Sequence, residues 1–225
     1  MKPLRHPIQV LSRAKRAGLL GVTLLVGFVL WYAAQRLDLP LRTPEAGWGI
    51  LSLEFSGTVE SSQEIVNSWN LTARENAKSG LLLDFLFPLC YSTVLTIACF
   101  WAASVFRDRG FRKTVWLATA IAWLQWPAAV CDYLENIALW IQLRGPIQDP
   151  WPAIARDSAT IKFALVAAGL CVIVAAAVIL VLRRRAHPAP IPPSAHARAV
   201  TSTPSLDAGI RPVPSHHEQP GERPA

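Results

Sequence analysis

Charged residues are scarce in this chain: they make up 16% of its 225 residues, whereas 52% of the residues are apolar. A soluble domain of this size carries more charge, so the composition indicates a membrane protein. The net charge of +7 does not indicate nucleic-acid binding, because the basic residues stand in short clusters beside apolar runs. The lipid bilayer is therefore the predicted partner, and no nucleic acid is expected.

Motifs for disulfide, metal or catalytic chemistry are lacking as well. The chain has four cysteines, all inside apolar runs, with neither CxxC spacing nor a nearby histidine: Cys90, Cys99, Cys131 and Cys171. They indicate neither a disulfide framework nor a zinc site, and we expect buried thiols. No Ser/His/Asp arrangement is recognisable, and no metal or cofactor is predicted.

Four apolar runs are long enough to cross a bilayer. They predict an all-α fold, a four-helix transmembrane bundle with spans at 17–35, 81–106, 114–143 and 158–182. A basic leader, residues 1–16, precedes the first run, which is also typical of a cleaved signal peptide. A cut after Ala33 or Ala34 would put Trp31 or Tyr32 where a small residue is needed, so an uncleaved helix is favoured.

The polar segment 36–80 is predicted to form a small extracytoplasmic cap. Its apolar stretch 47–54 is expected to lie along the membrane surface or to pair as a short strand. Ser61 and Glu64 have the spacing of a capping box. The apolar residues that follow it fall on one face of a short amphipathic helix: Ile65, Val66 and Trp69.

Basic residues orient the bundle. The leader, the 107–113 turn and the arginines after the last span together hold about twice as many Lys and Arg as segments 36–80 and 144–157. The positive-inside rule therefore predicts a multi-pass protein of the cell membrane with both termini cytoplasmic. Segment 144–157, rich in proline, is expected to be an extracytoplasmic loop. From residue 183 onward the proline-rich composition predicts a disordered cytoplasmic tail, 183–225.

Two prolines stand inside predicted spans. Pro88 has no amide hydrogen, so the carbonyl of Asp84 is expected to lose its helical partner. Pro127 is expected to kink the third span in the same way.

Polar residues inside the spans are the main indication of a site, because they are costly to hold in hydrocarbon. The candidate ligand-binding residues are Asp84, Asp132, Glu135, Asn136 and Lys162. The three on the third span share a helix face, since they stand three and four residues apart. At 1.5 Å per residue, all five are expected in the outer half of the bilayer.

The charges of this set do not balance, because three acids stand against one lysine. An unpaired ion in a low-dielectric site tends to neutralise. We therefore expect either a protonated acid or a further cation. Candidates for that cation are Arg74, Arg144, Arg156, a bound cation or the amine of a substrate.

Five segments of the chain stand out together: ILSLEFSGT, SSQEIVNSW, LDFLFPLCY, CDYLENIALW and IKFALV. These segments resemble blocks of a family of small, mainly bacterial four-helix membrane proteins that has no assigned activity. They contain D-F-x-F-P-x-x-Y and D-x-x-E-N blocks, and the resemblance covers about residues 47–170. It implies a shared architecture and adds Glu54, Trp69 and Tyr91 as supporting residues.

Three functions remain open from the sequence. The polar cluster binds or transports a small polar or cationic ligand, or it locks the helices of a structural or partner-binding protein. In the third alternative the protein is an enzyme acting on lipid headgroups or envelope precursors, with Asp132 or Glu135 as acid or base and Lys162 holding an anion. The sequence does not decide among them, nor does it give the oligomeric state.

Overall fold

The computed structural model describes residues 6–186, and every regular element among them is a helix. Four helices are long and apolar enough to cross a membrane: α2 (Arg13–Asp38), α6 (Phe87–Arg107), α7 (Arg112–Arg144) and α8 (Trp151–Ala186). The others are short: α1 (Pro7–Val10), η1 (Leu39–Leu41), α3 (Ile50–Glu54), α4 (Val59–Ser68) and α5 (Leu71–Asp84). The all-α fold with four long apolar helices is thus confirmed, while most of the predicted tail lies outside the described residues.

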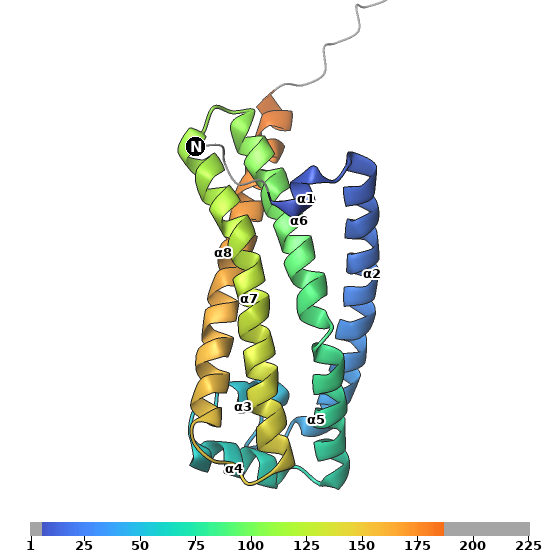
Figure 1. Cartoon of the computed structure of the whole chain (residues 1–225), viewed down its shortest axis with the longest axis vertical. Helices are drawn as coiled ribbons and strands as arrows, with labels where there is room; N and C mark the ends of the chain where they lie inside the picture. The colour runs from blue at the N-terminus through green and yellow to red at the C-terminus, as the bar shows by residue number, and fades with distance from the viewer. Residues whose placement is uncertain (1–5, 187–225) are drawn as a thin grey trace, which may run out of the picture. The chain divides into compact units, whose positions relative to one another are not determined.

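The four long helices lie side by side (Figure 1). α7 packs against α6 and α8, and α2 packs chiefly against α5 and α6. α3 and α4 cover one end of this bundle, which we call the α3–α4 end. The beginning of α2 and the end of α8 both lie at the opposite end.

The helix expected over 81–106 is divided at Asp84. α5 ends there, and α6 begins at Phe87 with Pro88 in its first turn. A proline in that position loses no helical hydrogen bond, because the first amides of a helix have no partner in the helix. Pro88 therefore starts a helix instead of interrupting one, and Asp84 stands at the junction of α5 and α6.

The last helix begins earlier than the sequence predicted. α8 starts at Trp151 and includes Pro152 in its first turn, so the loop expected over 144–157 is confined to the residues between α7 and α8. The prolines that suggested a loop are compatible with a helix start. As a result, Lys162 lies about three turns inside α8 rather than one. α7 is continuous through Pro127.

The segment before α5 forms short helices. Residues 50–54 are helical, so the alternative of a short strand is wrong. The predicted capping box at Ser61 is also wrong, because α4 already begins at Val59. Its N-cap is Thr58, whose Oγ1 accepts a hydrogen bond from the Ser61 amide at 3.2 Å. The predicted apolar face is confirmed, since Ile65, Val66 and Trp69 are all buried.

Three apolar clusters fill the bundle, and the smallest consists of Cys99, Phe100 and Ala122 between the other two. The cluster at the α3–α4 end includes Leu41, Ala46, Leu53, Ile65, Trp69 and Leu139. The opposite-end cluster is built mostly from small residues of α6, α7 and α8: Ala102, Ala103, Val105, Phe106, Ala118, Val172 and Ala176. α2 contributes no buried residue to these clusters, and Leu30 is the one residue of this helix that is buried.

α7 and α8 approach closely near Gly169. A Cβ at this position would stand 2.9 Å from Nε2 of Gln125. That amide nitrogen donates hydrogen bonds to the carbonyls of Ile121 and Leu165, at 3.1 and 3.2 Å. Gln125 is fully buried, so these contacts join the two helices in their middle.

The N-terminal helix α1 is anchored by His6, which is 2% exposed. The His6 ring packs at 4.4 Å from the Trp123 ring and 5.3 Å from Phe100. Its Nδ1 accepts a hydrogen bond from the amide of Ile8, and burial lowers the pKa of the imidazole. The His6 ring therefore closes the start of α1 against α6 and α7.

We predict that Gly49→Ala lowers the free energy of unfolding by about 1–3 kcal/mol. Gly49 has φ = 61°, and an added Cβ would collide with the Asp38 carboxylate. That carboxylate accepts a hydrogen bond from the Ile50 amide at 2.8 Å and so holds the start of α3. Thermal unfolding in detergent measures the effect.

Gly47→Ala is the matched control for this variant, because nothing lies within 4 Å of a Cβ at Gly47. It should unfold at the temperature of the unmodified protein. Equal unfolding temperatures for Gly47→Ala and Gly49→Ala would contradict the prediction.

Candidate functional site

A buried lysine on α8 is surrounded by carboxylates. Nζ of Lys162 donates hydrogen bonds to Oδ1 of Asp132 at 2.9 Å and to Oε1 of Glu135 at 2.7 Å. Oε2 of Glu54 lies 3.7 Å from the same nitrogen. All four residues are at most 7% exposed. One ammonium group therefore joins α8 to α7 and α3.

Local sequence explains how these side chains meet. Asp132 and Glu135 stand three residues apart on α7 and so share a face of that helix. Fully buried alanines let α7 and α8 approach closely at this level: Ala128, Ala138, Ala155 and Ala159. Glu54 is the last residue of α3, and the burial of the preceding Leu53 fixes that short helix over the bundle.

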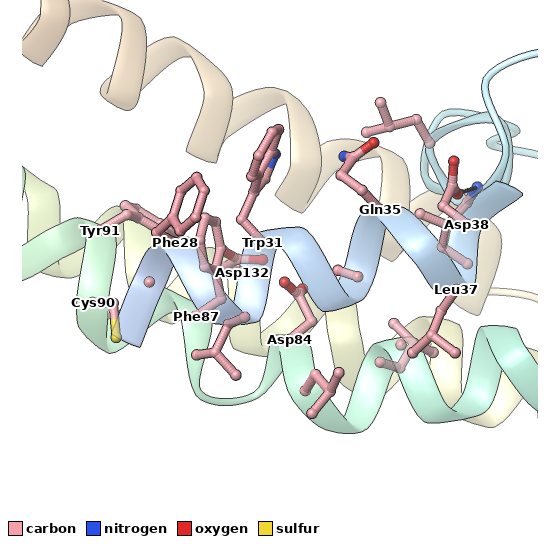
Figure 2. A pocket seen from close by; sticks show the side chains of 18 of the residues that line it. Phe28, Trp31, Gln35, Leu37, Asp38, Asp84, Phe87, Cys90, Tyr91 and Asp132 are labelled. Atoms are coloured by element: carbon pink, nitrogen blue, oxygen red, sulfur yellow. Dashed lines mark hydrogen bonds between the residues drawn. The ribbon is translucent and has the colours of Figure 1, made fainter. Parts of the chain in front are cut away.

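A cavity of about 680 Å³ borders the lysine. The residues that line it include Lys162 and three acids, which come from α8, α3, α5 and α7 in turn: Lys162, Glu54, Asp84 and Asp132. Figure 2 shows Asp84, Tyr91 and Asp132 among the aromatic rings of Phe28, Trp31 and Phe87. The lining of the cavity therefore combines acidic side chains with apolar and aromatic ones.

The structure brings together most of the residues that the sequence singled out. Asp132, Glu135 and Lys162 form ion pairs, and Asp84 lines the cavity with two of them. Glu54, suggested only by the family resemblance, reaches the same ammonium.

Asn136 and Tyr91 are placed beside this group rather than in an ion pair. Asn136 is fully buried, and neither its amide oxygen nor its amide nitrogen has a hydrogen-bond partner among residues 6–186. The buried hydroxyl of Tyr91, which lines the cavity, also lacks one within that range. The Tyr91 hydroxyl can therefore bond to a polar group that enters the cavity, whereas Asn136 does not line it.

Trp69 does not belong to this group. Its indole Nε1 donates a hydrogen bond to the Leu41 carbonyl at 2.7 Å, and its ring is part of the cluster at the α3–α4 end. Trp69 therefore lies apart from the charged residues, and its contacts hold the short helices in place.

The loop arginines do not complete the charge balance. Nε of Arg74 donates a hydrogen bond to the Trp69 carbonyl at 3.1 Å, and Arg144 lies over the Trp140 ring at 4.7 Å. Arg156 pairs with Asp157 at 2.8 Å. Each arginine is held by a neighbour close in sequence. The expectation that one of these arginines neutralises the buried acids is therefore wrong. A proton or a cation from outside the chain remains to balance the acids.

Two of the acids also keep a carboxylate oxygen unbonded. Oε2 of Glu54 and Oε2 of Glu135 are buried and have no hydrogen-bond partner in the described part of the chain. Within 6–186, no group of three or more His, Cys, Asp or Glu side chains is arranged to hold a metal ion. The arrangement thus presents hydrogen-bond acceptors around an ammonium group.

Sequence reasoning missed the contribution of α2. Phe28 and Trp31 line the cavity, but α2 is apolar throughout its middle and nothing in it marks these positions. The thiols were predicted only in part: Cys90 and Cys99 are buried, whereas Cys171 is exposed.

Comparison with protein-family models, with curated proteins and with solved structures found no match for this chain. The family resemblance of its sequence blocks is therefore still a prediction, and the site has to be interpreted from its own geometry.

We predict that Lys162→Met lowers the free energy of unfolding by about 3–5 kcal/mol, because it leaves several buried carboxylates without their counter-ion. Thermal or denaturant unfolding in detergent measures this loss. Lys78→Met is the matched control. Lys78 also forms a 2.8 Å ion pair, with Glu75, but both side chains are partly exposed to solvent.

The control should change stability by less than about 1 kcal/mol, the usual value for an exposed ion pair. A similar loss in the two variants would show that the buried cluster does not hold the helices together.

Proposed function

We propose that this chain is an integral membrane protein with four spans. It binds a small cationic ligand beside Lys162 and the acids that surround it. The observation that carries the proposal is the excess of buried acid. Glu54, Asp132 and Glu135 gather on one ammonium, and Asp84 lines the same cavity. α3, α4 and the α7–α8 loop face away from the cytoplasm in this proposal, and both termini are cytoplasmic.

Insertion in a membrane is supported by the surfaces of the long helices. Large apolar side chains are exposed along α2, α7 and α8, among them Leu25, Phe28, Val130, Val174 and Val178. A contiguous apolar surface of this length is not stable in water but suits hydrocarbon. The basic residues of the α6–α7 turn stand at the end opposite α3 and α4, which supports the orientation.

A cationic ligand is supported by electrostatics. Carboxylates removed from water repel one another strongly, and they remain ionised only beside enough positive charge. Lys162 supplies one charge to three close carboxylates. An ammonium group in the cavity would approach Asp84 and Glu54 and supply a second charge together with hydrogen-bond donors.

Transport through the bundle has less support than binding. Among the described side chains, no buried polar residue lies after Thr96 on α6, before Gln125 on α7 or after Lys162 on α8, where the opposite-end cluster fills the bundle. Catalysis by Asp132 or Glu135 also has less support, because both carboxylates already accept hydrogen bonds from Lys162.

A structural lock is the second candidate, and the two short hydrogen bonds of Lys162 favour it. A lock alone does not require the adjoining cavity or the additional acid at Asp84, and this distinguishes the two candidates. A lock predicts that Asp84→Asn leaves every binding measurement unchanged.

The orientation predicts the labelling of single cysteines introduced where all four native cysteines are replaced by alanine. Glu45→Cys should react with a membrane-impermeant maleimide in intact cells, whereas Asp108→Cys should react only after permeabilisation. Both positions are exposed. The reverse pattern would refute the orientation, and equal labelling of both in intact cells would refute four spans.

The ligand proposal predicts that butylammonium raises the unfolding temperature of the protein in lipid nanodiscs, whereas butanol and butyrate do not. Asp84→Asn should weaken butylammonium binding at least tenfold, since a hydrogen bond to a charged group contributes about 1.5–3 kcal/mol. The matched control is Asp108→Asn in the distant, exposed α6–α7 turn, which should bind as the unmodified protein does. Absence of binding, or equal binding by both variants, would contradict the proposal.

A further inference from the structure

The cavity changes from charged to apolar along its length. Its acids and Lys162 lie from its middle toward the α3–α4 end, where Leu37, Leu41 and Ile50 also line it. Farther along α2, α6 and α8 its lining is mainly apolar: Leu24, Gly27, Phe28, Val94, Leu95 and Val166. Thr23 is the polar exception there, and its hydroxyl is bonded to the Leu19 carbonyl at 2.8 Å. A ligand that fills the whole cavity is therefore charged at one end and apolar along the rest.

The cavity is also longer than a small cation requires. Its lining follows α2 from Thr23 to Asp38, which corresponds to about 22 Å along a helix. A volume of about 680 Å³ lies in the range of pockets that enclose drug-sized molecules. A short amine would occupy the acidic end and leave most of the apolar length unused.

The mouth of the cavity lies along α2 and α8. Leu24, Phe28 and Trp31 of α2 line the cavity, yet they are 50%, 61% and 48% exposed. Phe163 of α8 also lines it and is 42% exposed. In Figure 2, Phe28 and Trp31 project from α2 (blue) on the side where α8 (orange) passes. Side chains that both line a cavity and reach the surface mark its opening.

Access from the α3–α4 end is restricted by packed apolar residues, although Leu51 of α3 lines the cavity and is 37% exposed. Leu41 and Leu53 are at most 1% exposed, and Trp69 is 2% exposed. These residues belong to the cluster at that end, and Glu54 directly follows Leu53 on α3. The most exposed apolar lining belongs instead to α2, whose flank faces the hydrocarbon of the bilayer in the proposed function.

We infer that the ligand is a lipid-like amine, an ammonium headgroup on a hydrocarbon chain, which enters sideways from the bilayer between α2 and α8. The ammonium group lies near Asp84 and Glu54, and the chain extends along Leu24, Phe28 and Val94. This inference rests on the proposed function and specifies the class of ligand. It follows from charge complementarity at one end of the cavity and from the apolar mouth along the other.

Dodecylammonium and butylammonium in nanodiscs test this inference, because the two probes share a headgroup and differ in chain length. Leu24→Trp should weaken the binding of dodecylammonium at least tenfold, since the indole fills the space of the chain. It should leave butylammonium binding within twofold. Leu25→Trp is the matched control: Leu25 is the next residue on α2, is 66% exposed and does not line the cavity. It should alter neither affinity.

The outcomes separate the inference from the proposed function. If butylammonium binds through Asp84 but Leu24→Trp leaves dodecylammonium binding unchanged, the lipid-like ligand is refuted and the cationic site stands. If neither amine binds, both proposals fail. If dodecanol or dodecanoate binds as tightly as dodecylammonium, the cavity selects a chain without its charge and the inference is refuted. Unfolding temperatures without ligand confirm that both tryptophan variants fold.

Discussion

The arrangement of this molecule depends on one buried ammonium group. Lys162 is the point at which α8, α7 and α3 meet, because its nitrogen contacts carboxylates from both of the other helices. Removing such a cation from water is costly, and close carboxylates offset that cost only in a fixed geometry. Glu54 is the last residue of a helix of five residues, so this ion pair also orders the short helices over the bundle.

The two halves of the bundle differ in the interactions between their helices. Near α3 and α4, charged groups and a cavity interrupt the packing, whereas the other half is filled by small apolar residues. α2 stands apart from both, with one buried residue over its length. A molecule with three closely packed helices and one peripheral helix can admit a ligand at the peripheral helix without disturbing its core.

The sequence was sufficient to predict the four long helices and the proximity of Asp132, Glu135 and Lys162. The length of an apolar run and the helical period of its residues are local properties, so they can be recognised in the sequence alone. The ends of the helices were less predictable, because a proline starts a helix as readily as it ends one, as Pro88 and Pro152 show. The cavity wall on α2 was not predictable. An apolar helix has no polar side chain to mark which of its faces meets the protein, and the choice of Phe28 and Trp31 depends on how α2 packs on α5 and α6.

The contact of Gln125 with Gly169 has a mechanical consequence. Gln125 precedes Asp132 by seven residues, and Lys162 precedes Gly169 by the same number. Because α7 and α8 run in opposite directions, the close fit of Gln125 against Gly169 and the Asp132–Lys162 ion pair form two interhelical contacts one heptad apart, and Gln125 also donates a hydrogen bond to the Leu165 carbonyl. Sliding one helix along the other by a single residue would undo both at once. The α7–α8 pair is therefore stiff, and motion within the bundle is left to the long helices that neither contact joins, of which α2 has one buried residue.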